Sequence, residues 1–369
     1  MSRHAPPEVV LLLQGLRAPS QIVEVRCWER LLRLARMSGL HARLAEANAD
    51  NGAVPEAVRR HLLSSKRVAA YRAQMVRAEL FHLTPLVTDD FPVIVLKGGA
   101  YILQGRALAE GRFVSDVDLL VPNEHLRAME SRLRAAGWQP EKLDPYDERY
   151  YRDWSHETPP MRFPGHSLEV DLHHAITPVT GSLAFDPASL FERSEAIPGT
   201  PFRVLCAEDQ VLHACLHCFH DGELDLRVRE VVDIDGLLRT FAAHKGFWDR
   251  LVARAAELGL QRPLWYGLHF ARNWLDCPVP SAVSDGLPAP HTLSRAAMAA
   301  LVPLAMLPPD PDFPPPLRVR VARTLMRTRY HLLRMPLHLL LPHLARKTLR
   351  RLKARLDRRT EAPTEDGTP

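Results

Sequence analysis

The sequence predicts an α/β protein of the α+β kind, with a small mixed sheet flanked by helical regions at both ends. Apolar residues recur at helical spacing through 8–85 and again from 207 to about 256. Between these regions, 92–96 (PVIVL) and 112–121 (RFVSDVDLLV) have the β-branched, apolar character of buried strands. A chain of 369 residues with 46% hydrophobic residues is long enough to bury a substantial core.

Changes in composition divide the chain into five expected segments. The α/β core should lie between two helical regions, and a proline-rich stretch separates these from a basic end. The expected segments are 1–88 (helical N-terminal region), 89–205 (α/β core), 206–307 (helical C-terminal region), 308–359 (proline-rich linker and basic helical tail) and 360–369 (disordered end).

Turn residues mark the expected limits of elements within the core. Lys97-Gly98-Gly99 follows the first strand and should lead into a helix over 100–108. Pro164-Gly165 separates two short strand-like runs, 161–163 and 167–173, which predicts a hairpin.

Cysteine usage and the N-terminal sequence indicate a compartment. Five cysteines, an odd number without regular spacing, favour a reducing environment. The N-terminus has only a short apolar run, Val9–Leu13, and no small-residue cleavage site, which argues against a signal peptide. No stretch approaches the ~18 apolar residues of a spanning helix. We therefore expect a cytoplasmic protein without a transmembrane segment.

Charge is unevenly distributed along the chain. The formal total is +5, but 317–359 carries fourteen Lys or Arg and one acid, a local net of +13 that leaves about −8 for the rest. Any attraction to a polyanion is therefore expected at this tail. Aromatic residues for base stacking are scarce there. The tail predicts at most weak contact with RNA or an anionic membrane surface, and a solvated helix face is the plain alternative.

Two aspartates are the centre of the functional prediction. Asp116 and Asp118 are two residues apart in a predicted strand, so both side chains should leave the same face. Two carboxylates on an otherwise apolar strand are costly unless a positive group neutralises them. Mg²⁺ or Mn²⁺ is the usual solution, because hard cations prefer oxygen ligands. A pair of surface aspartates on an edge strand is the alternative.

The turn Lys97-Gly98-Gly99 has features of an anion-binding site. Glycines let backbone N–H groups approach a phosphate, a helix N-terminus favours an anion, and Lys97 adds a positive charge. A simple strand-to-helix turn is the alternative. Next to the aspartate pair, the turn favours a ligand that carries phosphate groups.

Glu169 and Asp171 repeat the same spacing on a later predicted strand. Two neighbouring strands that present carboxylates on one face could hold two metal ions, an arrangement that promotes phosphoryl displacement. One of these acids could also deprotonate the attacking group. His173 alternates onto the side of Asp171 and is a candidate to support the metal ligands or to act as a base. A plain strand residue is the alternative for both Glu169 and His173.

Taken together, these motifs resemble the polymerase-beta-like nucleotidyltransferase superfamily: strand, Gly-Gly, helix, a strand with Asp-x-Asp, and a later single Asp on a strand. More narrowly, the sequence resembles a bacterial group of uncharacterised nucleotidyltransferases with a Leu-Lys-Gly motif. The resemblance covers about residues 8–240. It rests on Leu96-Lys97-Gly98, on Arg112 with 115–121 (SDVDLLV) and on 170–173 (VDLH), with weaker matches at Leu216-His217 and Val231-Val232-Asp233.

The resemblance implies a nucleotidyltransferase core and a role for each motif residue. Asp116, Asp118 and Asp171 would be the catalytic and metal-binding triad. Arg112 would either reach a phosphate or pair with one of the first two aspartates. The residues expected to bind nucleotide are Lys97, Gly98, Gly99, Arg112 and Ser115. From their positions alone, the candidates to support the site are Glu169, His173 and His217, and a packed or surface histidine is the alternative for His217.

The implied reaction is Mg²⁺-dependent transfer of a nucleoside monophosphate from a nucleoside triphosphate to an unidentified acceptor, which could be a small molecule, a protein or RNA. A hydroxyl or similar group would attack the α-phosphorus, and pyrophosphate would leave. Two alternatives remain open: a phosphotransferase that uses the same site, and a non-catalytic nucleotide-binding scaffold. An RNA-directed enzyme would show salt-dependent RNA affinity through the basic tail.

Overall fold

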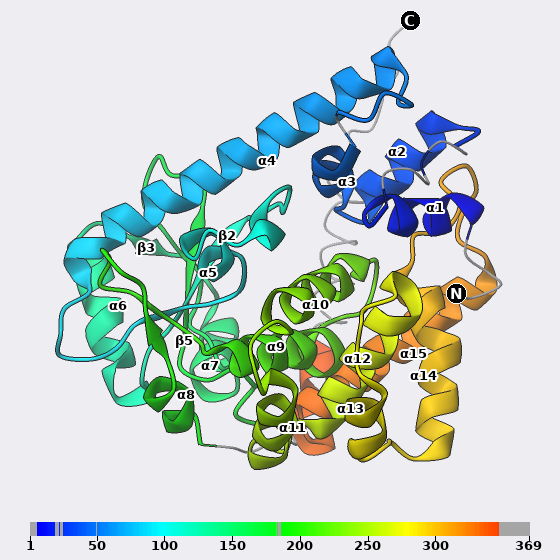
Figure 1. Ribbon diagram of the computed structural model, residues 1–369. Helices are drawn as coiled ribbons and strands as arrows, with labels where there is room; N and C mark the ends of the chain where they lie inside the picture. The colour runs from blue at the N-terminus through cyan, green and yellow to red at the C-terminus, as the bar shows by residue number, and fades with distance from the viewer. Residues whose placement is uncertain are drawn as a thin grey trace, which may run out of the picture.

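The computed structural model, which describes residues 6–18, 22, 25–48, 50–181, 183 and 186–346, contains a seven-stranded mixed sheet with helices around it (Figure 1). The strand order is β3-β4-β5-β2-β1-β7-β6. β2 pairs in parallel with β5 and antiparallel with β1, so the predicted α/β class is confirmed. The strands are β1 Ile94–Val95, β2 Asp116–Leu120, β3 Gln139–Pro140, β4 Met161–Arg162, β5 Glu169–His173, β6 Glu195–Ala196 and β7 Arg203–Val204.

Two strands are shorter than their sequence patterns predict. β1 has two residues instead of the five of 92–96, and β2 begins at Asp116 rather than at Arg112. β2 is as long as its ladder with β5, which ends at the pair Asp116 and Glu169. The β-branched pattern thus predicts where the strands lie, while the length of the paired strand determines how many residues each strand contains.

The helix that follows β1 also differs from its prediction. α5 spans Lys97–Leu103 rather than 100–108. It begins earlier because the turn is made by Lys97 alone, at a φ of 47°, and it stops before Gly105, which has a φ of 60°. The predicted hairpin is confirmed, because β4 pairs antiparallel with β5 around Gly165, which has a φ of 87°.

The N-terminal region is helical, as predicted, and its last helix is the longest described. α4 passes along the sheet and extends to the helices α1–α3 (Figure 1). The loop predicted at Asn51-Gly52 joins α3 to α4. The four helices are α1 Pro7–Gly15, α2 Trp28–Met37, α3 His41–Asn48 and α4 Glu56–Leu83.

The helical region after the sheet contributes one side of the site. It is confirmed from Ala207 onward, where α9 continues into a π-helical turn over His217–Asp221. Buried apolar side chains from the N-terminal helices, the sheet and these helices form one continuous cluster. The remaining helices are α6 Leu126–Ala135, α7 Pro145–Asp153, α8 Ala188–Glu192, α9 Ala207–Leu216, α10 Val228–Phe241, α11 Phe247–Glu257, α12 Gln261–Leu275, α13 Ser281–Gly286, α14 Thr292–Met306 and α15 Leu317–Arg334.

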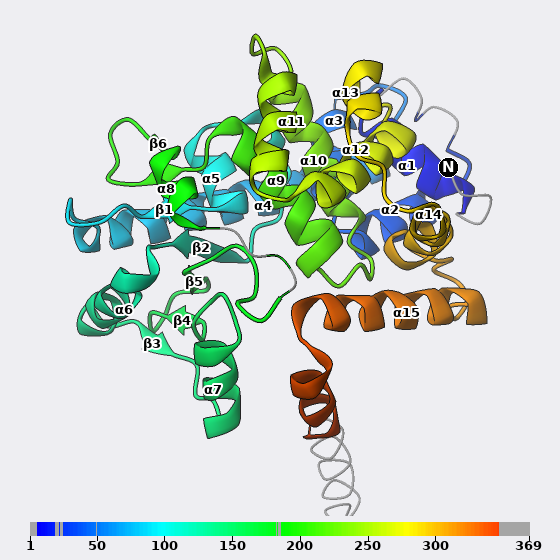
Figure 2. The ribbon, with the colours of Figure 1, turned by 90° about the horizontal axis from the view of Figure 1, so that it is seen from below.

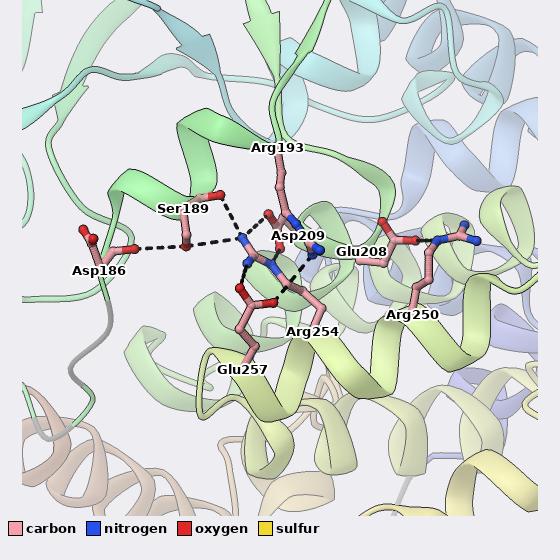
Figure 3. A network of polar contacts seen from close by, with 8 residues as sticks. All are labelled: Asp186, Ser189, Arg193, Glu208, Asp209, Arg250, Arg254 and Glu257. Atoms are coloured by element: carbon pink, nitrogen blue, oxygen red, sulfur yellow. Dashed lines mark hydrogen bonds and ion pairs between the residues drawn. The ribbon is translucent and has the colours of Figure 1, made fainter.

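A buried arginine ties α9 to the helices beside it (Figure 3). Arg254 on α11 is 1% exposed and makes two hydrogen bonds to Asp209 on α9, with Nε 2.7 Å from Oδ1 and Nη2 2.9 Å from Oδ2. It also donates to Glu257 Oε1 at 2.6 Å and to the backbone oxygen of Ser189 on α8 at 3.0 Å. The network fixes the start of the helix that leads to His217.

The basic C-terminal segment packs as a helix over its first part. α15 contacts α14 and the π-helical turn, and residues 337–346 form a further helical stretch after it. The rest of the predicted tail and the predicted disordered end, 347–369, lie outside the described residues. Among the described helices, none combines the length and the apolar character needed to cross a membrane.

Candidate active site

The two carboxylate pairs predicted from the sequence lie on neighbouring strands. In the parallel ladder of β2 and β5, Asp116 is paired with Glu169 and Asp118 with Asp171. Because side chains alternate along a strand, in-register parallel partners project from the same face. The prediction of one shared carboxylate face is therefore confirmed, and Val117, Leu119, Val170 and Leu172 are buried on the sheet's other side.

Asp118 is the most firmly held of these acids. Its Oδ1 accepts a hydrogen bond from Lys97 Nζ at 2.7 Å and lies 2.9 Å from His173 Nε2. Burial alone would raise the pKa of Asp118, but Lys97 and His173 outweigh burial and hold it well below its ordinary value. The same attraction, with that of Asp116 and Glu157, raises the pKa of Lys97 although burial opposes it. Asp118 is an anion in this site.

Asp171 is less well satisfied than its neighbour across the ladder. Its Oδ1 is buried and has no hydrogen-bond partner among the described residues. Burial and the charge of Asp118 raise the pKa of Asp171 to about 7, with smaller contributions from Glu157 and Asp116. Burial and Asp118 also raise the pKa of Asp116, against the pull of Lys97 and Arg112. Neighbouring cations do not fully offset burial and the nearby acids at either of these two carboxyls.

The Gly-Gly turn is shaped by close packing. A Cβ at Gly98 would collide with the Arg112 guanidinium and lie 2.9 Å from Val114 Cγ2, and one at Gly99 would lie 2.8 Å from Val95 Cγ1. Both positions therefore need glycine. Gly98 lines the cavity beside the aspartates, whereas Gly99 is buried against β1. A role for either glycine at a phosphate stays a prediction.

The aspartates and the turn line one cavity of about 270 Å³. Its walls combine four cationic side chains with six acidic ones, so the lining is mostly charged. The predicted residues that line it are Lys97, Gly98, Arg112, Ser115, Asp116, Asp118, Asp171 and His217. Ser115 precedes β2, so the alternation of side chains along the strand does not direct it to the opposite face. It can therefore line the same cavity as the aspartates.

Arg112 has a partner that neither sequence alternative named. Its Nε lies 3.0 Å from Asp233 Oδ2 on α10, and Arg43 on α3 also pairs with Asp233. Burial would raise the pKa of Asp233, but Arg112, Arg43 and Arg229 outweigh it and hold the pKa below its ordinary value. Arg112 is held in the cavity wall rather than on Asp116 or Asp118.

Two predicted supporting residues are placed differently from each other. His173 contacts Asp118 directly, so it lies where its prediction required. Glu169, in contrast, pairs with Arg162, its side chain is 44% exposed, and it is not part of the cavity lining. Strand alternation put both acids of β5 on one face, but Glu169 lies at the end of the ladder.

His217 and Glu230 contribute to the wall opposite the sheet. His217 Nε2 lies 3.6 Å from Glu230 Oε1, which also forms an ion pair with Arg227 Nε at 3.1 Å. Burial, Lys97 and Arg227 hold the pKa of His217 well below its ordinary value, so the ring is neutral. Burial also raises the pKa of Glu230.

Several lining residues were not among the predicted site residues: Tyr101, Glu157, Arg227, Arg229, Glu230 and Asp233. A usable signal existed for the last four, because 227–233 (RVREVVD) places charges in an otherwise apolar helical stretch. No pattern marked Glu157, which enters the site because its segment forms a β-bridge with His173.

Of the comparisons with known proteins, the match to a family profile identifies the family. No curated protein matches the chain. The crystal structure of JHP933 from Helicobacter pylori is similar at 12% sequence identity over 71% of this chain and 93% of that chain, with a TM-score of 0.31. A family profile described as uncharacterised nucleotidyltransferase matches residues 25–276, more than half of the sequence. The chain therefore belongs to this family of uncharacterised nucleotidyltransferases.

Proposed function

We propose that this chain transfers a nucleoside monophosphate from a Mg²⁺-bound nucleoside triphosphate to the hydroxyl of an acceptor. The observation that carries the proposal is the in-register pairing of Asp118 with Asp171, beside Asp116 and within one cavity with Lys97 and Arg112. Carboxylates that face cations across a small polar cavity suit a metal-bound polyphosphate.

The three aspartates fit a divalent cation. Asp171 Oδ1 is buried without a partner, and burial and neighbouring acids raise the pKa of both Asp116 and Asp171. A hard cation would relieve both costs, so Asp116, Asp118 and Asp171 would hold Mg²⁺ or Mn²⁺. When bound, the ion would neutralise charge on the transferring phosphate oxygens.

The charged residues of the cavity would then have separate roles in the transfer. Lys97, Arg112, Arg227 and Arg229 would bind the triphosphate and stabilise the leaving pyrophosphate. Asp171 would take the proton of the acceptor hydroxyl through its second carboxylate oxygen. A new bond forms between the acceptor oxygen and the α-phosphorus, and the bond from the α-phosphorus to the bridging oxygen of pyrophosphate breaks.

His173 would act on the reaction through Asp118. Its Nε2 and Lys97 Nζ both contact Asp118 Oδ1, which restricts the carboxylate to one orientation.

The acceptor would bind in a second cavity. This cavity, about 420 Å³, lies between α7 and the C-terminal helices. Tyr151 lines this second cavity, and burial and the charges of Glu157, Glu141 and Asp171 raise its pKa to about 12. Because Glu157 and Asp171 line the first cavity, charges in one cavity act on a residue of the other. The volume is that of a small-molecule site.

The lining of the second cavity favours an acceptor with a planar ring, and its charged side chains are of both signs. Tyr146, Tyr150 and Tyr330 offer aromatic rings, and Arg334 and Arg346 offer cations. Arg346 already lies over the Tyr146 ring at 4.2 Å, so the cavity presents paired aromatic and cationic surfaces.

Calorimetric titration with ATP, CTP, GTP and UTP tests the metal-dependent step of this proposal. At least one triphosphate should bind with Mg²⁺ or Mn²⁺ and lose affinity in excess chelator. Asp116→Ala/Asp118→Ala should abolish the binding, whereas Glu169→Gln, outside the cavity, is the matched control and should retain it. Equal affinity with and without the cation in the native protein would contradict the assignment.

A further inference from the structure

The outer face of α15 carries a stripe of exposed apolar residues. Leu317, Val321 and Leu325 follow one another at four-residue spacing, and Leu332 lies two turns further on. Their exposed fractions are 72, 45, 46 and 49%. The opposite face, with Val319, Ala322 and Met326, is buried against the body of the protein. The four exposed residues, here called the outer stripe, are therefore additional to the core face of the helix.

Arginines flank the outer stripe on both sides. With about 100° between successive residues, Arg318 lies along one edge, and Arg320 and Arg327 lie along the other. All three are exposed. Arg323 lies on the inner side and pairs with Asp225 at 2.9 Å, which helps to hold the helix on the body. Arg327 also pairs with Asp225, at 3.7 Å, and with Glu223, at 3.6 Å, so Arg318 and Arg320 are the arginines offered to a partner. An apolar stripe between exposed arginines is the pattern of a helix that lies at an interface between water and an apolar phase.

The chain that follows α15 extends this surface. Leu337 and Leu341 are one turn apart in the helical stretch 337–346 and are 58 and 63% exposed. Figure 2 shows α15 along one edge of the molecule, and the stretch 337–346 turns away from the axis of α15 and contacts α7 through Arg346 and the Tyr146 ring. The sequence beyond it, 347–359, contains seven of the fourteen basic residues of the tail. Apolar and basic side chains thus continue together past the end of α15.

Charge complementarity selects the partner of this surface. The segment 317–359 has a net charge of +13, whereas the rest of the chain carries about −8. A second copy of the chain would bring two cationic helices face to face, which is unfavourable. RNA would match the charge, but it offers nothing to the outer stripe, and Tyr330 lines the second cavity instead of the outer face. An anionic bilayer surface offers headgroups to the arginines and hydrocarbon to the leucines.

We infer that the outer stripe and its flanking arginines bind the surface of a membrane that contains anionic lipids. The helix would lie in the plane of the interface with Leu317, Val321, Leu325 and Leu332 between the headgroups. Because no described helix can span a bilayer, the attachment is peripheral. This surface is separate from the cavity with the aspartates, so the inference holds whatever reaction that cavity catalyses.

Vesicle flotation with the full chain tests the inference. The protein should float with phosphatidylcholine vesicles that contain phosphatidylglycerol and stay behind with phosphatidylcholine alone. Val321→Gln/Leu325→Gln should reduce the partition coefficient at least about tenfold, because two apolar side chains would no longer enter the interface. Arg318→Gln/Arg320→Gln should reduce it and weaken its dependence on salt. Leu293→Gln on α14, at a leucine that is even more exposed (74%), is the matched control and should bind like the native chain.

Three results would overturn the inference. The first is equal partition of the native chain and the Val321→Gln/Leu325→Gln variant, with both folded by circular dichroism. The second is no vesicle binding together with salt-dependent RNA binding that this variant retains, which would assign the surface to nucleic acid. The third is no vesicle binding together with a dimer, detected by light scattering, that this variant loses, which would assign it to self-association.

Discussion

Asp118 and Asp171 lie opposite each other on two parallel strands, yet only Asp118 is compensated. Lys97 Nζ and His173 Nε2 both contact Asp118 Oδ1, while Asp171 Oδ1 is buried without a partner. The asymmetry assigns different tasks to two like residues: Asp118 is a permanent anion, and Asp171 is poised to gain a cation or a proton.

The first prediction separates Asp171 from Glu169. Asp171→Asn should nearly abolish turnover but leave affinity for the Mg²⁺-bound triphosphate within a few-fold. Asp116 and Asp118 should dominate that binding, whereas Asp171 would complete the site of the ion that activates the acceptor. Glu169→Gln should be mild, since Glu169 pairs with Arg162 outside the cavity. Steady-state rates and calorimetric affinities for both variants provide the comparison. A larger loss of turnover in Glu169→Gln would mean that the third carboxylate is misassigned.

The second prediction concerns pH. Asp171 has a pKa of about 7, so it is largely protonated below that pH and a metal ion must displace the proton. The apparent affinity for Mg²⁺ should therefore rise as pH increases through about 7 and level off above it. Calorimetry in buffers of different ionisation enthalpy should detect a proton released on binding near pH 6. Asp171→Asn should release fewer protons, and an unchanged proton count would argue against Asp171 as a ligand.

The third prediction concerns the wall formed by Arg112, Asp233 and Arg43. Asp233→Asn would leave two buried arginines without their shared anion, which should cost about 3–5 kcal/mol of folding free energy. The pKa of Asp233 is lowered in the folded protein, so its contribution is present above the unfolded pKa of about 3.9 and is lost as pH falls through the lower folded value. Urea unfolding at neutral pH should show the destabilisation. A change within the error of the measurement would indicate that the arginines are stabilised by other groups.

The fourth prediction tests the network that fixes α9. Asp209→Asn would remove the anion that Arg254 contacts twice in a buried position, and it should destabilise the fold by about 3–5 kcal/mol. Arg250→Gln is the matched control, because the Arg250 side chain is 53% exposed and its pair with Glu208 should contribute less than about 1 kcal/mol. Thermal unfolding of both variants measures the difference. Equal shifts would show that burial of the Arg254 pair carries no special weight.

The carboxylate face could be predicted because it depends on local geometry. The two-residue period of a strand fixes Asp116 with Asp118 and Glu169 with Asp171, and the apolar residues between them identify the buried side. The ladder of β2 and β5 then aligned the two pairs. The order of helical and strand regions could also be predicted, because it too depends on the local periodicity of apolar residues.

The partners of individual side chains could not be predicted, because they come from distant segments. Arg112 is 121 residues from Asp233 in the sequence. Their contact requires α10 to pack beside the Lys97-Gly98-Gly99 turn, where the absence of a side chain at Gly98 leaves space for the Arg112 guanidinium. Glu169 looked equivalent to Asp171 until its place at the end of the ladder and its pair with Arg162 were known. Strand ends were missed because the partner strand, rather than the residue pattern, limits them.

Transfer of radioactive label tests the central claim most directly. The native chain is incubated with Mg²⁺, cell extract and each nucleoside triphosphate labelled at either the α- or the γ-phosphorus, beside the Asp116→Ala/Asp118→Ala variant. Label should reach an acceptor from the α position only, and the variant should transfer none. Transfer from the γ position alone would establish a phosphotransferase instead, and equal transfer by the variant would place the reaction outside this site.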